Sequence, residues 1–283
     1  MKHALLITAY TDFTVLKNMV CSYKEHYDCY IHVDKKTKMP IEILQELNAY
    51  ENVTIISKYK VNWGSYRHIS AILQLMKLAV ANGPYDYYHI MSGNTLIVKP
   101  VGEFDAFFQA DRDKNYMEII DFRGTESEKD IEEWFAYYHY PFLYNKKGKH
   151  HVFWDNVEYY FIKLQKKAEF RRKVSFSYKG YVYCHLNEVF VKYVLAYVKK
   201  NPKYLSQIKY CHVGEEFFFQ NIIMNSEYKD TVINNPLIYD DWSAERERPA
   251  VLDMRDYPEL QNPQVLFARK IGAASQELFS HFL

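Results

Sequence analysis

Long apolar runs are missing from this 283-residue sequence. No stretch approaches the roughly 20 apolar residues that a membrane-spanning helix requires. The first ten residues lead directly into a strand-and-helix pattern and lack the cleavage region of a signal peptide. The sequence therefore predicts neither a membrane span nor a secretory leader.

Cysteine is scarce as well. The chain has four, with no CxxC pair and no zinc-site spacing, at Cys21, Cys29, Cys184 and Cys211. Cys29 and Cys184 fall in apolar runs typical of strands, which predicts buried free thiols. Together these features predict a cytoplasmic protein in a reducing compartment.

An excess of charge of either sign is also absent. The formal net charge is +1, which argues against a nucleic-acid-binding surface. The phosphate-binding patterns GxxxxGK[ST] and GxGxxG do not occur, and neither do the catalytic patterns GxSxG and HExxH. His32 and the pair His150-His151 are isolated from other plausible ligands, so we expect no catalytic metal site.

Aromatic residues, in contrast, are abundant, with 27 Tyr and 18 Phe. Tyrosine combines a flat apolar face with a polar tip and suits carbohydrate surfaces. Compositional bias explains the same excess equally well. A basic cluster at Lys166-Lys167 and Arg171-Arg172-Lys173 lies on a predicted helix, where it forms a solvated helix face or a contact with anionic lipid.

Strand and helix patterns alternate in the first half. Short apolar runs predict strands at 3–9, 30–33, 53–57 and 85–91, and helical spacing predicts helices at 13–25, 41–50 and 65–81. This order is typical of an α/β fold with a mostly parallel central sheet and helices on both faces. Such sheets bind ligands at the carboxyl ends of their strands. Asp34, Trp63 and residues 92–94 (Ser-Gly-Asn) are therefore placed to contact a ligand.

The second half is less regular. It predicts strands at 116–122, 179–185, 234–240 and 265–270, and helices at 129–138, 157–173, 188–199, 214–225 and 273–283. No internal repeat, low-complexity tract or linker separates the halves. We expect a single domain over 1–283 with an elaborated second half.

The most informative motif is Glu215-Glu216 at the start of a predicted helix. A carboxylate fixed there can serve as a general base. The alternative is structural, since acidic residues in a first helical turn suit the helix macrodipole.

Cations stand near the end of the chain at Arg246, Arg248, Arg269 and Lys270. Fixed cations can stabilise a departing diphosphate without a metal. For Arg246 and Arg248 the alternative is an ordinary exposed loop. One Asp-x-Asp triplet, Asp111-Arg112-Asp113, could hold a metal ion on a diphosphate. It follows the helical run 104–110, however, and we interpret it as a solvated helix end.

Five segments occur in an order that resembles a known family. They are HVDKK at 32–36, VNWGS at 61–65, residues 87–100, EEFFFQN at 215–221 and FARK at 267–270. The chain is similar to the core-2/I-branching β-1,6-N-acetylglucosaminyltransferases, which include the peptide O-xylosyltransferases. The resemblance runs from about residue 3 to 271, whereas residues 112–180 fit poorly and should shape the acceptor site.

The resemblance implies a GT-A-type nucleotide-sugar-binding fold, a UDP-sugar donor, inversion at the anomeric carbon and no metal or other cofactor. It makes 1–110 the nucleotide-binding half and 111–283 the acceptor and catalytic half. It places the catalytic base on Glu216. It also places five residues at the donor: Asp34 near the uracil, Trp63, Lys270 at the diphosphate, and Arg248 or Arg246 as the partner of Lys270. The acceptor side takes Tyr239 and Trp242, with Glu215 and Asp121 beside them as the next candidates for the base.

We therefore expect a metal-independent, inverting glycosyltransferase that moves N-acetylglucosamine or xylose to a glycan hydroxyl. Eukaryotic members carry a membrane anchor and disulfides, and we expect neither here. The resemblance thus suggests a bacterial version that acts in surface polysaccharide synthesis, on an oligosaccharide or lipid-linked acceptor, with peripheral contact at the inner membrane. One alternative is a metal-dependent transferase that uses Asp111 and Asp113, which activity in EDTA would separate. Another is a non-catalytic glycan-binding protein.

Overall fold

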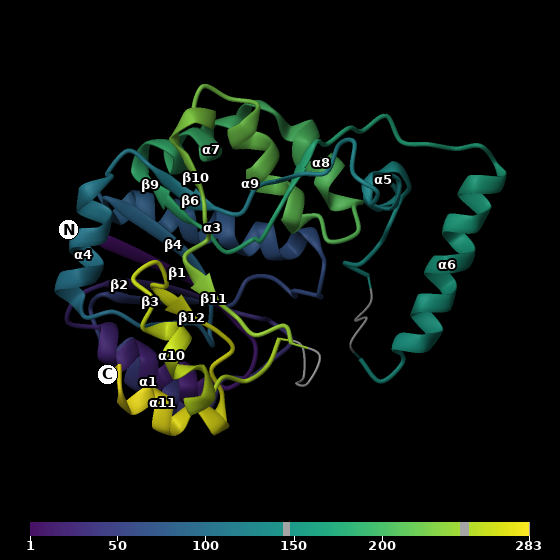
Figure 1. The fold of residues 1–283 in the computed structure, drawn as a ribbon. Helices are drawn as coiled ribbons and strands as arrows, with labels where there is room; N and C mark the ends of the chain where they lie inside the picture. Colours follow the sequence, from purple (N-terminus) through teal and green to yellow (C-terminus); the bar gives the residue numbers. More distant parts are fainter. Residues whose placement is uncertain (144–147, 244–248, 283) are drawn as a thin grey trace.

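A seven-stranded sheet forms the centre of the computed structural model, which describes residues 1–143, 148–243 and 249–282. Its strand order is β10-β6-β9-β4-β1-β2-β3 (Figure 1). The strands are β1 (His3–Ala9), β2 (Asp28–Val33), β3 (Val53–Ile56), β4 (Tyr87–Ser92), β6 (Asn115–Met117), β9 (His185–Asn187) and β10 (Val232–Asn234). Of these, β9 alone runs antiparallel to its neighbours β4 and β6. The α/β class and the mostly parallel sheet are as predicted.

Helices cover both faces of the sheet. One face packs against α3 (Tyr66–Asn82), α7 (Glu188–Lys200), α8 (Pro202–Lys209) and α9 (Glu215–Met224). The other packs against α1 (Phe13–Tyr23), α2 (Ile41–Asn48), α4 (Val101–Ala110), α10 (Tyr257–Leu260) and α11 (Gln276–Ser280). Because successive strand residues point to opposite faces, Leu6 of β1 joins the first core and its neighbours Leu5 and Ile7 join the second.

The strands of the first half read as continuous apolar runs because both of their faces are buried. All of β1 except Thr8 is buried, and so is all of β4. The predicted helix at 65–81 is α3, and it buries Ile69, Ile72 and Met76 on one side.

Several predicted elements of the second half are interrupted. The strand expected at 116–122 is divided into β6 and β7 (Ile120–Asp121), and the strand at 179–185 into β8 (Tyr178–Lys179) and β9. The strand at 234–240 is likewise divided into β10 and β11 (Ile238–Tyr239). At Gly180, between β8 and β9, the Glu118 carbonyl lies where a Cβ would be, so only glycine fits at this position. Alternation of apolar residues does not reveal such a contact.

Two predicted helix boundaries were also wrong. The helix expected at 157–173 is α6 (His151–Lys167), and it ends just before Glu169, which has a left-handed φ of 52°. Helix α8 was not predicted. Helices α5 (Glu128–Ala136) and α6 lie at the periphery, away from the central sheet (Figure 1). Among the described residues, no helix is long and apolar enough to cross a membrane.

Two small sheets complete the fold. In the first, β12 (Phe267–Ala268) lies between β11 and β5 (Leu96–Ile97). It joins the end of the chain to the segment that follows β4. The second is the antiparallel pair β7 and β8, which contacts α9. The four cysteines are free thiols, as predicted.

Candidate active site

The carboxyl ends of β1, β2 and β4 lie side by side at one edge of the sheet. Thr8 of β1 is the register partner of both His32 of β2 and Ser92 of β4. The amide of Gly93 donates to the Thr8 carbonyl (2.9 Å), and the amide of Asp34 donates to the Ala9 carbonyl (2.8 Å). Thus the predicted ligand-contacting segments after β2 and β4 do meet at this edge.

The motif at 61–65 lies against the start of α9. Gly64 has a φ of 69°, and a Cβ there would lie 3.2 Å from Val213 Cγ1. A glycine is needed here both for the left-handed φ and for the close approach. Two motifs about 150 residues apart in the sequence are therefore in direct contact.

Glu215 is enclosed by protein. Only 11% of its side chain is exposed, and burial raises the pKa of its carboxyl group to about 8. The Nδ1 atom of His68 lies 4.0 Å from Glu215 Oε1, and His68 Nε2 lies 3.1 Å from Thr8 Oγ1. Burial lowers the pKa of His68 to about 4. These contacts connect the end of β1 to the start of α9 through a neutral imidazole.

His68 was not predicted from the sequence. Its one signal was its place in the first turn of a helix that is otherwise apolar on its buried side. Contacts with Thr8 and Glu215 span 60 and 147 residues, which no local pattern reveals.

Glu216 differs from its neighbour, since one third (33%) of its side chain is exposed. Its Oε2 atom lies 3.4 Å from Lys179 Nζ. Burial raises the pKa of Glu216, and the Lys179 ammonium opposes this shift. Lys179, which the sequence analysis also missed, lies over the ring of Trp134 (4.9 Å to the centroid). Glu216 is therefore the more accessible of the two carboxyl groups and the one with a cationic partner.

The β7–β8 pair delivers Lys179 to this position. The amide of Gly180 donates to the Glu216 carbonyl (2.9 Å), and the amide of Tyr181 donates to Glu118 Oε2 (2.9 Å). The bond from the Gly180 amide to α9 fixes the preceding Lys179 beside this helix, and the absence of a side chain at Gly180 permits the close approach to Glu118.

The segment after β12 returns to the same edge of the sheet. The amide of Ile271 donates to the Asn94 carbonyl (2.9 Å), so Lys270 lies next to the segment that follows β4. Within the described parts of the chain, no carboxylate oxygen lies within 4.0 Å of Lys270 Nζ. Residues 92–94 offer hydroxyl and amide groups rather than carboxylates at the point where Lys270 approaches.

Arg269 is held within the protein. Its side chain is 13% exposed, it lies 3.7 Å from Asp240 Oδ2, and it donates to the Tyr181 hydroxyl. Its guanidinium also stacks over the ring of Tyr183 (4.9 Å). Of the two cations predicted at the end of this strand, Arg269 is structural and Lys270 remains available to a ligand. The predicted partners Arg246 and Arg248 lie outside the described residues.

Asp34 joins two loops at the predicted donor side. Its Oδ1 accepts from the amides of Lys36 (2.9 Å) and Val61 (3.2 Å), and Lys36 Nζ donates to Asn62 (2.7 Å). These bonds hold the loops after β2 and β3 together. Trp63, at the tip of the second loop, is 48% exposed and meets His212 edge to face (6.0 Å).

The predicted acceptor residues are less concentrated. The Tyr239 hydroxyl donates to Asp256 (3.1 Å), and Trp242 is 54% exposed. Asp121 is an exposed residue of β7 that pairs with Arg123 (2.5 Å), which lowers the pKa of its carboxyl group. Asp121 is opposite Tyr178 in the β7–β8 pair, one residue from Lys179.

Asp111 and Asp113 lie at the opposite edge of the sheet. The Tyr87 hydroxyl donates to the Asp111 carbonyl (2.8 Å), and Asn187 donates to the Asp113 carbonyl (2.8 Å). Tyr87 begins β4 whereas Ser92 ends it, so five residue steps, or about 17 Å, separate the two edges. Asp111 and Asp113 therefore lie far from the edge at which β1, β2 and β4 end.

Comparisons with known proteins agree with the resemblance seen in the sequence. The family model of the Core-2/I-Branching enzyme matches residues 4–262. Xylosyltransferase 1 of Mus musculus is 24% identical over 226 residues, which cover 78% of this chain and 22% of that protein. The xylosyltransferase of Ciona intestinalis is 23% identical over 238 residues, which cover 80% of this chain and 25% of that protein. The chain thus spans about a quarter of the length of these relatives.

Among solved structures, TarS of S. aureus in complex with UDP-GlcNAc aligns with a TM-score of 0.33 at 13% identity, over 44% of this chain and 36% of that chain. A similarity this low adds nothing to the fold described above. The family match, in contrast, extends over most of the sequence and includes Asp34, Trp63 and the Glu215-Glu216 pair. The chain belongs to the Core-2/I-branching enzyme family, a family of glycosyltransferases.

Proposed function

We propose that this protein transfers a sugar from a UDP-sugar to a glycan hydroxyl by a single displacement with inversion, and that Glu216 is the general base. The observation that carries the proposal is the contrast at the start of α9. Glu216 reaches solvent and pairs with Lys179, whereas Glu215 is buried. In this reaction Glu216 accepts the proton of the acceptor hydroxyl while that oxygen bonds to the anomeric carbon and the bond to the diphosphate breaks.

The protonation states favour Glu216 over Glu215 in this role. A base must be ionised, and the pKa of about 8 leaves Glu215 mainly protonated at neutral pH. The Lys179 ammonium favours the carboxylate form of Glu216, as does its place in the first turn of α9. Glu215 is also enclosed by protein, so it is the less suitable of the two carboxyl groups for this role.

The leaving diphosphate needs charge stabilisation rather than protonation. We assign this role to Lys270, which has no described carboxylate partner, together with Arg248 or Arg246 from the predicted donor set. Cations fixed at the position where charge develops stabilise the transition state more than the ground state. No metal is required in this scheme, because the end of β4 presents Ser92 and Asn94 instead of carboxylates.

The donor nucleoside would lie between the loops that Asp34 joins, with Trp63 beside it. N-acetylglucosamine and xylose are the favoured sugars, on the strength of the family and of relatives named xylosyltransferase. Tyr239 and Trp242 would contact the acceptor from the opposite side.

A membrane-bound acceptor is supported by α6. Exposed apolar residues recur on one side of this helix at helical spacing, at Phe153, Val157, Tyr160 and Leu164. Exposed lysines (Lys163 and Lys167) flank them, as in helices that lie on anionic lipid surfaces. We therefore propose a lipid-linked glycan acceptor at the cytoplasmic face of a bacterial membrane. Loss of binding to anionic vesicles after Phe153→Ser and Leu164→Ser tests this placement.

A donor screen tests the function as a whole. We expect UDP and one of UDP-N-acetylglucosamine, UDP-xylose, UDP-glucose or UDP-galactose to raise the melting temperature, and slow hydrolysis of that donor without acceptor. Trp63→Ala should weaken UDP and the UDP-sugar equally. Stabilisation by glycans alone, without any effect of a uridine nucleotide, would instead favour the non-catalytic glycan-binding alternative.

A further inference from the structure

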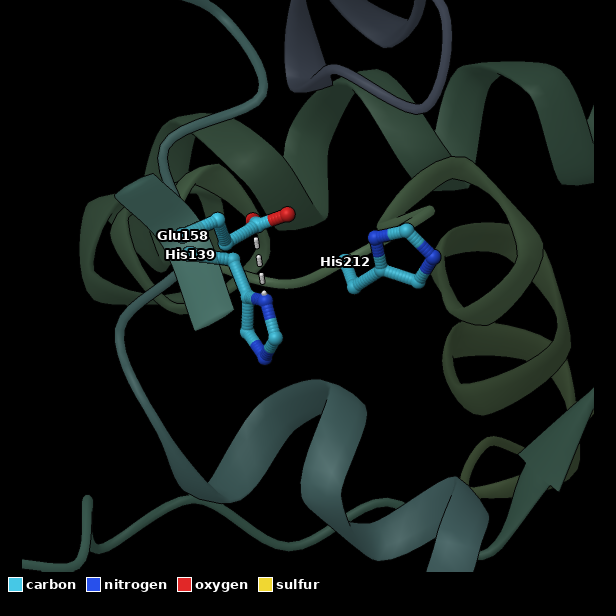
Figure 2. A group of neighbouring side chains, drawn as sticks. All are labelled: His139, Glu158 and His212. Carbon is cyan, nitrogen blue, oxygen red and sulfur yellow. Dashed lines mark hydrogen bonds and ion pairs between the residues drawn. The ribbon is translucent and has the colours of Figure 1, made fainter. Parts of the chain in front are cut away.

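Three side chains from distant parts of the sequence converge beside the start of α9 (Figure 2). They are His139 after α5, Glu158 in α6 and His212 in the turn before α9. One potential ligand atom from each lies within 4.8 Å of the other two. Figure 2 shows the two imidazoles and the carboxylate around a common space. They border a cavity of about 280 Å³, which Asp130, Glu133 and Trp134 also line.

His139 is oriented as a metal ligand would be. Its Nε2 lies 3.0 Å from the Glu133 carbonyl oxygen, which can only accept, so this nitrogen carries a proton. In the neutral ring, Nδ1 then presents a lone pair, and it lies 3.2 Å from Glu158 Oε1. Two electron pairs face each other across this distance, and a cation between them, or a second proton on the ring, resolves the repulsion. A backbone carbonyl on the other ring nitrogen is the usual outer partner of a histidine that binds zinc.

The spacing suits a four-coordinate ion. With zinc–ligand bonds of about 2.0–2.1 Å, ligand atoms in a tetrahedral site are about 3.3 Å apart. The His139–Glu158 pair already has this separation, and His212 needs to approach by at most about 1.5 Å. The side chains of His139 and Glu158 are 7% and 10% exposed, so the site is largely shielded. The cavity leaves room for water as the fourth ligand.

We propose that His139, Glu158 and His212 form a zinc-binding site. Two imidazoles and one carboxylate suit zinc, whereas magnesium and calcium prefer oxygen ligands alone. The ion would tie α6 to the turn before α9. The amide of His212 donates to the Trp134 carbonyl (2.8 Å), and its ring contacts the rings of Trp134 and Trp63. The ion would therefore fix the rings of Trp134 and Trp63, and Trp134 lies next to Lys179, the partner of Glu216. The ion would take no part in holding the diphosphate.

Zinc titration of the metal-stripped protein tests the site. After EDTA treatment and desalting, we expect one zinc ion to bind per chain by calorimetry and to raise the melting temperature, with no such effect of Mg²⁺. Bound Co²⁺ should show the visible absorption of a four-coordinate complex. His139→Ala, His212→Ala and the nearly isosteric Glu158→Gln should each weaken zinc binding by more than about tenfold.

His150→Ala and His151→Ala are matched controls, because both histidines are exposed and adjoin the start of α6. These variants should bind zinc as the unaltered chain does. Circular dichroism of the metal-free variants shows whether each is folded, and Glu158→Gln gives a result even if a histidine variant is not. The proposal is wrong if the unaltered chain shows no saturable zinc binding, or if zinc binding survives Glu158→Gln and is lost in the control variants. In that case His139 and Glu158 form an ordinary ion pair.

Discussion

Lys179 and Glu216 form an ion pair between segments 37 residues apart, with Lys179 Nζ 3.4 Å from Glu216 Oε2. The pair lies at the start of α9, next to the buried Glu215. Two adjacent glutamates thus have different environments, one shielded from water and the other partly exposed beside a cation. In a direct displacement only one carboxylate need act as the base, and this difference selects it.

Removal of Lys179 should shift the pH dependence of transfer. Burial raises the pKa of Glu216 and the ammonium opposes this shift, so Lys179→Met should raise the pKa further and move the acidic limb of the kcat/KM profile to higher pH. The measurement is a pH–rate profile of both enzymes. Lys173→Met, which removes an exposed lysine elsewhere, is the control. An acidic limb that does not move in Lys179→Met would show that Glu216 is not the group that titrates.

Because the pKa of Glu215 is raised in the folded protein, the free energy of unfolding should decrease as the pH rises. The folded chain keeps this proton up to about pH 8, whereas the unfolded chain releases it near 4.5. The folded state therefore binds more protons between these values, and the free energy of unfolding decreases as pH rises, by up to about 1.4 kcal/mol per pH unit. His68 has the opposite effect on the free energy of unfolding between about pH 4 and 6.5. In this range its ring is neutral in the folded chain and protonated in the unfolded chain.

Between pH 6.5 and 8, therefore, the free energy of unfolding of Glu215→Gln should decrease less with pH than that of the unaltered protein. Urea denaturation at both pH values measures the effect, and Glu227→Gln, on an exposed residue just past α9, should leave it unchanged. An equally steep decrease in Glu215→Gln would mean that Glu215 is ionised in the folded protein.

Arg269 and Lys270 should respond in opposite ways to substitution. Arg269→Met leaves the partly buried Asp240 without its cation and should destabilise the protein by roughly 1–3 kcal/mol in urea denaturation. Lys270→Ala should leave stability nearly unchanged but weaken UDP binding and slow transfer, because charge on the diphosphate grows in the transition state. Normal UDP affinity in Lys270→Ala would remove the cationic stabilisation from the mechanism.

Mg²⁺ and Mn²⁺ should not change the affinity of the protein for the donor nucleotide. We expect the same UDP affinity with either ion and without both, and the double substitution Asp111→Asn with Asp113→Asn should leave transfer intact. This comparison is independent of zinc at His139, Glu158 and His212, since the readout is UDP affinity in excess Mg²⁺ or Mn²⁺. Tighter UDP binding in Mn²⁺ that the double substitution abolishes would restore the metal-dependent alternative.

Local sequence patterns predicted the part of the site that depends on strand ends. Asp34 and residues 92–94 follow buried apolar strands, and a parallel sheet necessarily brings such ends to one edge. Helices α3 and α9 were recognisable because an apolar face or a distinct start marks each of them. In these elements a local pattern and the global fold agree.

Contacts between distant segments were not predictable in this way. His68 and Lys179 have their roles only because β1, β8 and α9 pack together. The group His139, Glu158 and His212 spans 73 residues and shares no motif. The close approach of Gly180 to the Glu118 carbonyl likewise joins segments 62 residues apart, which alternation of side chains cannot show.

The most direct test of the central claim is the turnover of Glu216→Gln with the donor that the screen identifies. The change keeps the shape of the side chain but removes its ability to accept a proton. We predict a decrease in the transfer rate of roughly 10²–10⁴-fold, with UDP affinity unchanged and the folded state preserved. Near-normal turnover would contradict the account and would move the base to Glu215 or Asp121.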